Sequence, residues 1–189
     1  MKIRSGIKSQ LVVLTGSLIS GKTEVGLELE KRGFQFVPEA ARIYIDNELA
    51  RGLTKEVIRS NEGDFQRSIL RYKLRTEREL QKNKLYFLDR AMPDSISYYR
   101  VAGLNPKEIW QLCKLIVYKK IFIFDLLPDE IAERILQDDK YRTENLRIRK
   151  YLDRQLEQDY CSLGYDVSRI PFRTITERVE LVLKQLNLW

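Results

Sequence analysis

The chain of 189 residues contains no histidine and only two cysteines, Cys113 and Cys161, which lie far apart. These absences exclude the classical zinc sites and the Ser-His-Asp and Cys-His catalytic arrangements. So few cysteines favour a reducing, cytoplasmic setting. No hydrophobic run approaches the roughly 20 residues that a membrane helix needs, and the polar, basic segment from Met1 to Gln10 lacks the apolar core of a signal peptide. We therefore expect a cytoplasmic protein with no membrane partner.

The chain also lacks internal repeats, low-complexity segments and linkers, so residues 1–189 are expected to form a single domain. Its net charge of +7 suits anionic partners such as nucleotides, phosphorylated metabolites or nucleic acid. Nucleic acid is disfavoured as a partner, because we find no zinc finger, no aromatic pattern for single strands and no separate basic tail. A nucleic-acid-linked NTPase is therefore the weakest of the functional hypotheses.

One segment, Gly16 to Thr23, has the spacing G-x-x-x-x-G-K-T of a phosphate-binding loop. It follows the apolar run Leu11–Leu14 and precedes a helical pattern, which is the strand, loop and helix order that such a loop needs. Its glycines permit a tight backbone turn whose N–H groups surround an anion, and the helix dipole adds to this attraction. Lys22 is expected to reach the β- and γ-phosphates, and the Thr23 hydroxyl to bind Mg²⁺. The predicted nucleotide-binding residues are Gly16, Ser17, Ser20, Gly21, Lys22 and Thr23.

Short apolar segments alternate with helical patterns along the rest of the chain. The expected strands are residues 10–15, 34–37, 85–90, 120–125 and 165–171. This alternation predicts a three-layer α/β/α sandwich with a five-stranded parallel sheet, the nucleoside and nucleotide kinase-like form of the P-loop fold. Gly26 is expected to let the first helix pack close to the sheet, and Thr174 to Glu177 form a capping box before the last helix.

A long helical region from residue 39 to about 84 is expected to break near Arg51–Leu53 and again near Asn61–Gly63. Its predicted buried stripe consists of Phe65, Ile69, Tyr72 and Leu80. Its basic residues are expected on a solvent-exposed face; they are Arg67, Arg71, Lys73, Arg75 and Arg78.

Three charged residues follow the ends of predicted strands and are expected to meet the phosphate-binding loop at one edge of the sheet. Asp89 ends an apolar strand and can hold Mg²⁺ beside Thr23, or alternatively cap a helix. Glu39 can take a proton from an acceptor hydroxyl that attacks the γ-phosphate, or complement a helix dipole. Arg42, one turn later, can bind the acceptor, with a surface salt bridge as the alternative interpretation.

Further arginines are candidates for binding the acceptor or the transferred phosphoryl group. Arg90, next to Asp89, can orient an acceptor or neutralise charge that develops during transfer. Arg142, Arg147 and Arg149 cluster near a predicted loop–helix junction, in a possible lid over residues 138–150. Arginines on a closing lid can hold phosphoryl oxygens and exclude water, whereas the alternative is an ordinary basic helix start. Tyr98 and Tyr99 can stack on a base or pack in the core, and we expect at least one in the core.

These motifs resemble those of nucleoside and nucleotide kinases among the P-loop proteins. Pro38-Glu39 resembles the acidic motif after strand two of deoxynucleoside kinases, in which the glutamate is the base. Asp89-Arg90 resembles their acidic-Arg pair, and Arg142 to Arg149 their lid. The second proline of the glutamate motif is replaced by Ala40, and the lid spacing is loose.

A closer resemblance covers nearly the whole chain. The chain resembles a family described as predicted AAA-type ATPases in four short segments. They are Val37–Arg42, Phe87–Arg90 with Asp94 and Tyr98 soon after, Leu163-Gly164-Tyr165, and Ile170-Pro171 followed by Thr176-Glu177-Arg178. This family groups with the ATP-binding domains of ribosylnicotinamide kinases and of TRPL translocation-defect proteins. The resemblance implies binding of ATP and Mg²⁺, with GTP as the alternative nucleotide. Asp89 is followed by arginine rather than a second acidic residue, which argues against an AAA+ machine with a power stroke.

Two main functions remain from the sequence. The first is a small-molecule kinase that transfers the γ-phosphate of ATP to a nucleoside- or nucleotide-like acceptor, whose identity the sequence does not specify. The second is a nucleotide-binding regulator or slow NTPase without a small-molecule acceptor, which we keep because the sequence shows no readable acceptor pocket. The oligomeric state stays open.

Overall fold

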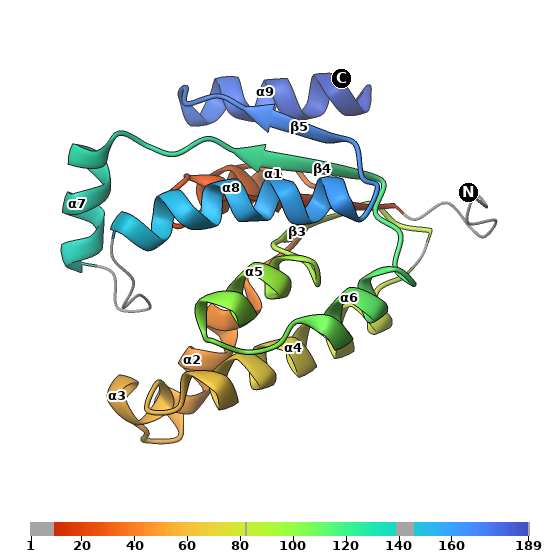
Figure 1. Cartoon of the computed structure of the whole chain (residues 1–189). Helices are drawn as coiled ribbons and strands as arrows, with labels where there is room; N and C mark the ends of the chain where they lie inside the picture. Colours follow the sequence, from red (N-terminus) through yellow and green to blue (C-terminus); the bar gives the residue numbers. More distant parts are fainter. Residues whose placement is uncertain (1–9, 82, 139–145, 189) are drawn as a thin grey trace.

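Five parallel strands lie at the centre of the computed structural model, which describes residues 10–81, 83–138 and 146–188 (Figure 1). Their order across the sheet is β2-β3-β1-β4-β5, and every neighbouring pair is parallel. The strands are β1 (Leu11–Thr15), β2 (Gln35–Val37), β3 (Tyr86–Asp89), β4 (Lys120–Phe124) and β5 (Val167–Ile170). The predicted five-stranded parallel sheet is confirmed.

Helices connect consecutive strands on both faces of the sheet. They are α1 (Lys22–Lys31), α2 (Ala40–Ala50), α3 (Lys55–Ile58), α4 (Glu62–Glu79), α5 (Asp94–Val101), α6 (Lys107–Cys113), α7 (Asp129–Asp138), α8 (Leu146–Ser162) and α9 (Ile175–Leu186). The long helical region breaks into α2, α3 and α4 where expected, and Thr54 and Asn61 cap the two new starts. The predicted capping box of Thr174 and Glu177 is present. Helix α6 ends at Cys113, and Tyr118, beyond its end, donates a hydrogen bond to Glu77 of α4.

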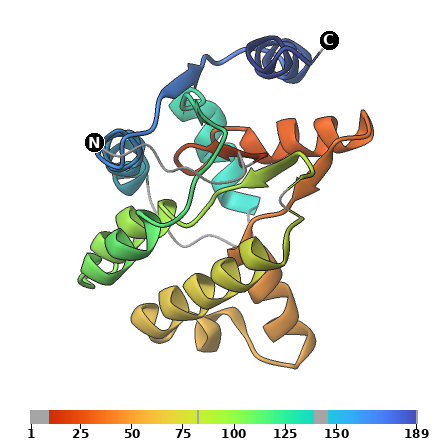
Figure 2. The same ribbon diagram turned by 90° about the vertical axis from the view of Figure 1, so that its right-hand side faces the viewer.

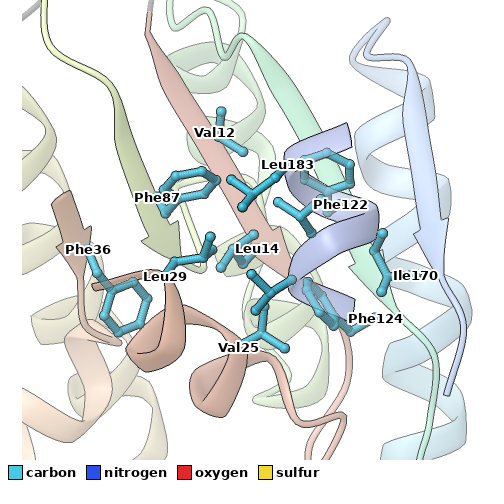
Figure 3. Close-up of a cluster of buried hydrophobic side chains, with 12 residues drawn as sticks. Val12, Leu14, Val25, Leu29, Phe36, Phe87, Phe122, Phe124, Ile170 and Leu183 are labelled. Carbon is cyan, nitrogen blue, oxygen red and sulfur yellow. The ribbon is translucent and has the colours of Figure 1, made fainter. Parts of the chain in front are cut away.

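Strand β1 is buried on both faces, which explains its uninterrupted apolar sequence. Val12 and Leu14 point into a cluster with α1 and α9 (Figure 3), in which Val25 and Leu183 are buried. Val13 points to the opposite face, where the cluster includes Tyr160 of α8. The two clusters define the three layers of the α/β/α sandwich, with β1 in the middle.

Helices α2, α3 and α4 form a separate group at one end of the molecule, opposite α9 (Figures 1 and 2). Phe65 and Ile69 of α4 are buried there against Ile45 of α2, so two members of the predicted buried stripe are confirmed. Tyr72 and Leu80 are half-buried. The prediction for Lys73 was wrong: its side chain is buried, because Ile69 and Lys73 lie four residues apart on the same helix face. None of the helices in the described residues is both long and apolar enough to cross a membrane.

Gly26 of α1 packs against the ring of Phe36 in β2. A Cβ atom built on Gly26 would lie 2.1 Å from Phe36 Cε2 and 2.3 Å from Cζ. Any larger residue at position 26 would therefore push the helix from the sheet or displace a core ring. This is the close approach that the sequence predicted.

Gly26→Ala is expected to lower the free energy of unfolding by about 1–3 kcal/mol, because overpacking outweighs the gain in helix propensity of about 1 kcal/mol. Urea unfolding monitored by circular dichroism measures this change. The matched control is Gly63→Ala in α4, where the new methyl group meets no side-chain atom closer than 3.2 Å. Adding Phe36→Leu to Gly26→Ala should restore part of the loss. Equal stability of Gly26→Ala and the wild type would contradict this packing.

Candidate active site

The phosphate-binding loop joins β1 to α1 at the middle of the sheet, and its shape depends on Gly16. The backbone φ of Gly16 is 146°, and a Cβ there would lie 2.7 Å from the carbonyl oxygen of Phe124. The side chains of Ser17 and Ser20 are buried. Ser17 Oγ donates a hydrogen bond of 2.5 Å to the carbonyl of Arg149, whereas Ser20 Oγ has no hydrogen-bond partner among the described residues.

Lys22, at the start of α1, meets two carboxylates from the ends of neighbouring strands. Its Nζ lies 3.5 Å from Asp89 Oδ1 and 3.9 Å from Glu39 Oε2, and its side chain is 2% exposed. Thr23 Oγ1 donates a hydrogen bond of 2.6 Å to Asp89 Oδ2. Because parallel strands end at one edge of the sheet, the fold brings together residues up to 67 positions apart in the sequence, from Lys22 to Asp89.

The Thr23 and Asp89 oxygens fit a Mg²⁺ ion. Asp89 Oδ1 is buried and accepts no hydrogen bond from the described residues. The donor set is one carboxylate and one hydroxyl beside a phosphate-binding loop, and Mg²⁺ completes such a set with phosphate oxygens and water. Among the described residues, no group of three or more Cys, Asp or Glu side chains forms a protein-only metal site.

Arg90 follows β3 with a left-handed backbone, φ 67°, which is uncommon for a residue other than glycine. This turn directs its side chain back toward the phosphate-binding loop. Nε donates to Glu39 Oε1 at 2.9 Å, and Nη1 donates to the carbonyl of Gly16 at 2.8 Å. Its Nη2 is buried without a hydrogen-bond partner among the described residues. Arg90 therefore positions Glu39 and the loop and keeps one donor for a ligand.

Asp94, in the first turn of α5, is a site residue whose role sequence reasoning missed. Its fully buried carboxylate accepts hydrogen bonds from Thr15 Oγ1 at 2.5 Å, Tyr160 OH at 2.6 Å and Arg90 Nη1 at 3.1 Å. Burial alone would raise the pKa of Asp94, but the positive charges of Lys73 and Arg90 lower it below its ordinary value. An aspartate in the first turn of a helix suggests only a cap, so the sequence carried no specific signal for this role.

Lys73, the second missed residue, lies beneath the same site. Its Nζ donates to the carbonyl of Ala91 at 3.0 Å and to Ser95 Oγ at 3.2 Å. Burial lowers its pKa, and the charge of Asp94 opposes that shift. In the sequence, the spacing of four residues between Ile69 and Lys73 already indicated that both side chains lie on the same, buried face of the helix.

Next to Glu39 a cavity of about 50 Å³ opens between α2, α4 and α5. Apolar side chains form much of its wall, and Arg90, Lys73 and Gln66 supply polar groups. Gln66 is 6% exposed and donates to Glu62 Oε1 at 2.8 Å. The lining residues are Leu18, Glu39, Ala41, Arg42, Ile45, Arg59, Phe65, Gln66, Ile69, Lys73, Arg90 and Tyr98. We call this space the acceptor cavity.

A second, larger cavity of about 240 Å³ lies on the other side of the loop, and we call it the nucleotide cavity. It is lined by Ile19, Ser20, Gly21, Lys22, Thr23, Glu24, Arg42, Leu127, Ile135, Phe172, Arg173, Ile175 and Arg178. Phe172, in the connection between β5 and α9, and Ile175, the first residue of α9, are half exposed. They add exposed apolar surface to this cavity, which the sequence did not indicate. Arg42 lines both cavities, and its Nε lies 3.7 Å from Glu39 Oε2.

The expected lid falls largely outside the described residues. Arg142 lies outside them, and Arg147 is exposed at the start of α8, so their catalytic roles stay predictions. Arg149 differs from the expectation of a phosphate-holding lid arginine. It is 1% exposed, donates to the carbonyl of Leu18 at 3.0 Å and also to that of Leu127, and pairs with Asp129 at 2.8 Å. It therefore braces the loop against the start of α7.

Of the two tyrosines, Tyr99 is buried as expected, whereas Tyr98 lines the acceptor cavity. The ring of Tyr98 lies 5.1 Å from Arg90 Cζ.

A parallel sheet with a phosphate-binding loop after its central strand defines a P-loop, nucleotide-binding α/β protein of the kinase-like class. The chain belongs to an AAA-domain family, whose sequence model matches residues 11–178. No curated protein matches the sequence.

Solved structures with this fold include several nucleoside and nucleotide kinases. Deoxyadenosine kinase from M.mycoides has a TM-score of 0.59 at 14% identity, covering 94% of this chain and 98% of that one. Thymidylate kinase from Ehrlichia chaffeensis has a TM-score of 0.64 at 16% identity, covering 95% and 99%. The NadR protein in complex with NR has a TM-score of 0.67 at 19% identity, covering 93% of this chain and 51% of NadR. At these identities the likeness concerns the fold.

Glu77, one turn beyond Lys73, generates a pH prediction. Its carboxylate accepts hydrogen bonds from Met92 N at 2.9 Å and Tyr118 OH at 2.6 Å, and burial raises its pKa from 4.5 to about 7. Between pH 4.5 and pH 7, Glu77 keeps its proton in the folded protein but has released it in the unfolded chain. The wild type should therefore lose stability as the pH rises from 4.5 to 7 and no more above that.

Glu77→Gln removes this titration, so its stability relative to the wild type should increase between pH 5 and pH 8. Urea unfolding of both proteins at several pH values measures the difference. Glu79→Gln is the control, since Glu79 is exposed on the same helix and bonded to Arg75. Parallel pH curves for wild type and Glu77→Gln would show that Glu77 titrates normally.

Proposed function

We propose that the protein is a kinase that transfers the γ-phosphate of ATP to a hydroxyl group of a nucleoside-like small molecule. The observation that carries this proposal is the position of Glu39. Its carboxylate lies 3.9 Å from Lys22 Nζ and lines the acceptor cavity. A base at the γ-phosphate end of the loop, with an open cavity of apolar and polar side chains beside it, is the arrangement that phosphoryl transfer to a hydroxyl requires.

Each residue at the junction of the two cavities has a role in this reaction. Lys22 binds the β- and γ-phosphates, and Thr23 and Asp89 would hold Mg²⁺, which neutralises phosphate charge when bound. Glu39 accepts the proton of the acceptor hydroxyl as its oxygen bonds to the γ-phosphorus and the bond to the β-phosphate oxygen breaks, releasing ADP. Arg90 holds Glu39 at 2.9 Å through Nε and offers Nη2 to the acceptor.

The acceptor cavity distinguishes this proposal from a regulator or slow NTPase, which needs no such space. The similar structures support a nucleoside-like acceptor, because they include a deoxyadenosine kinase, a thymidylate kinase and a NadR protein bound to NR. The carboxylate of Glu39 favours a hydroxyl over a phosphate as the attacking group, since a hydroxyl needs a base to take its proton whereas a phosphate is already ionised. Mg-ATP as phosphate donor, with GTP as alternative, and a cytoplasmic location are part of the proposal.

The direct test incubates the purified protein with ATP labelled at the γ-phosphate, Mg²⁺ and panels of nucleosides, nucleotides and ribosylated vitamins. The readout is the compound that carries the label. Label on a nucleoside-like compound supports the proposal and identifies the acceptor. Release of free phosphate only, or ATP binding without turnover, supports the regulator or NTPase instead.

Glu39→Gln should lower kcat by about 10²–10⁴-fold, because that is the usual contribution of a positioned base, while ATP still binds. Calorimetry measures ATP binding and the label assay measures transfer. Lys22→Ala is the matched variant, in which ATP binding itself should be lost. Retention of full activity by Glu39→Gln would remove Glu39 from the role of base.

Gln66→Leu should raise the KM for the acceptor roughly 10-fold or more, since a lost hydrogen bond in a buried site costs about 1–3 kcal/mol. The Kd for ATP should stay unchanged, because Gln66 lines only the acceptor cavity of the two. Arg67→Leu is the control, since Arg67 is exposed on the same helix. An unchanged acceptor KM would place the acceptor elsewhere.

A further inference from the structure

Arg178 of α9 reaches the phosphate-binding loop from the far end of the chain. Its side chain is buried, with the residue 3% exposed, and Nη1 donates to the carbonyl of Ser20 at 2.7 Å. Its guanidinium carbon lies 4.8 Å from the centroid of the Phe124 ring, and Nη2 approaches the carbonyl of Asp125 at 3.4 Å. A Cβ on Gly21 would lie 2.8 Å from Nη1. The guanidinium is thus in contact with the loop backbone.

Arg178 differs from the other cations that line the nucleotide cavity in having no carboxylate partner. Lys22 lies within 3.9 Å of two carboxylates, Arg42 lies 3.7 Å from Glu39, and Arg173 lies 3.4 Å from Glu177. For Arg178 no ion pair exists within the described residues, and its Nε is buried without a hydrogen-bond partner there. The nearby Asp125 carboxylate is instead bonded to Arg169 at 2.8 Å.

A buried cation without a counter-ion is unfavourable, because its lost hydration is not replaced by an opposite charge. Burial lowers the pKa of Arg178 to about 10, so the side chain is still charged at neutral pH. The Asp125 and Glu24 carboxylates attract this charge without forming an ion pair with it, and its two hydrogen bonds go to neutral carbonyl oxygens, so the compensation is only partial. A polyphosphate in the same cavity would supply both the negative charge and the acceptor oxygens that Nε lacks.

We infer that Arg178 binds the polyphosphate of the nucleotide, and that the nucleotide is the counter-ion of this buried guanidinium. The inference rests on the proposed function, since it requires a nucleotide in the cavity, but it does not depend on the acceptor. The inference makes α9 part of the nucleotide-binding site, although α9 follows the loop by more than 150 residues. It also links nucleotide binding to the packing of α9 on α1 and the sheet.

The alternative role for Arg178 is a brace that holds the carbonyl of Ser20. Two substitutions separate the roles. Arg178→Gln removes the charge but keeps an N–H donor for Ser20, whereas Arg178→Lys keeps the charge. Lys184→Gln is the matched control, because Lys184 is an exposed cation on the same helix and does not line the nucleotide cavity. Calorimetry measures the Kd of ATP and of inorganic tripolyphosphate, and thermal unfolding without ligand measures folded stability.

Arg178→Gln should weaken binding of both ATP and tripolyphosphate roughly 10- to 100-fold, the usual range for a lost charged hydrogen bond. Its Tm without ligand should not fall, because an incompletely compensated charge has been removed. Arg178→Lys should stay within about tenfold of the wild type and bind more tightly than Arg178→Gln. Lys184→Gln should resemble the wild type.

Three results would overturn the inference. The first is that Arg178→Gln binds ATP and tripolyphosphate as tightly as the wild type. The second is that Arg178→Lys binds them as weakly as Arg178→Gln, with a lower Tm in both variants, and the third is that Arg178→Gln binds ATP more weakly but tripolyphosphate as before. The second result identifies a brace and the third a contact with the base. Failure of the wild type itself to bind ATP would instead remove the proposed function, and the inference with it.

Discussion

The active-site arrangement depends on one buried ion pair, between Arg90 and Asp94. The two side chains lie 3.1 Å apart, and both are almost completely buried. Neither charge is stable there alone, because removing one partner leaves the other without compensation in a medium of low dielectric constant. Asp94 also binds Thr15 of β1 and Tyr160 of α8, and Arg90 binds Glu39 and the carbonyl of Gly16. The pair therefore connects the central strand, the phosphate-binding loop, the end of β3 and the outer helix layer.

From this pair, charges of alternating sign extend across the site. Lys73, Asp94, Arg90, Glu39, Lys22 and Asp89 follow one another from the floor of the acceptor cavity to the predicted metal site. Asp94 and Glu39 thus each lie between two cations, and Arg90 and Lys22 each lie between two carboxylates. The charges of Lys73 and Arg90 hold the pKa of Asp94 below its ordinary value despite burial, and the ion pairs limit the movement of the side chains. It also gives Glu39 a fixed position between Arg90 and Lys22, where an acceptor hydroxyl and the γ-phosphate would meet.

Some residues of the candidate site could be placed from the sequence and others could not, depending on whether their position is set by the ends of strands and helices or by contacts with distant segments. Lys22, Thr23, Glu39, Asp89 and Arg90 could be gathered in advance, because parallel strands end at one edge of a sheet and each of these residues follows a strand or starts a helix. Lys73 was placed on the wrong face, although its spacing from Ile69 already pointed inward. Asp94 gave the signal of an ordinary helix start, and Arg149 that of a lid arginine. Their actual partners are 79 positions away from Asp94, at Thr15, and 131 positions away from Arg149, at Leu18.

The sequence by itself determined the phosphate-binding loop, the five strands and the parallel layered fold. These features depend on local information: residue spacing within a few positions, hydrophobic period and the backbone freedom of Gly16. Only the tertiary structure decided where the two cavities open, which of the 34 lysines and arginines are buried, and which of those have a counter-ion. Burial and charge pairing depend on contacts between distant segments, such as Arg178 of α9 with Ser20 of the loop, and no local pattern encodes them.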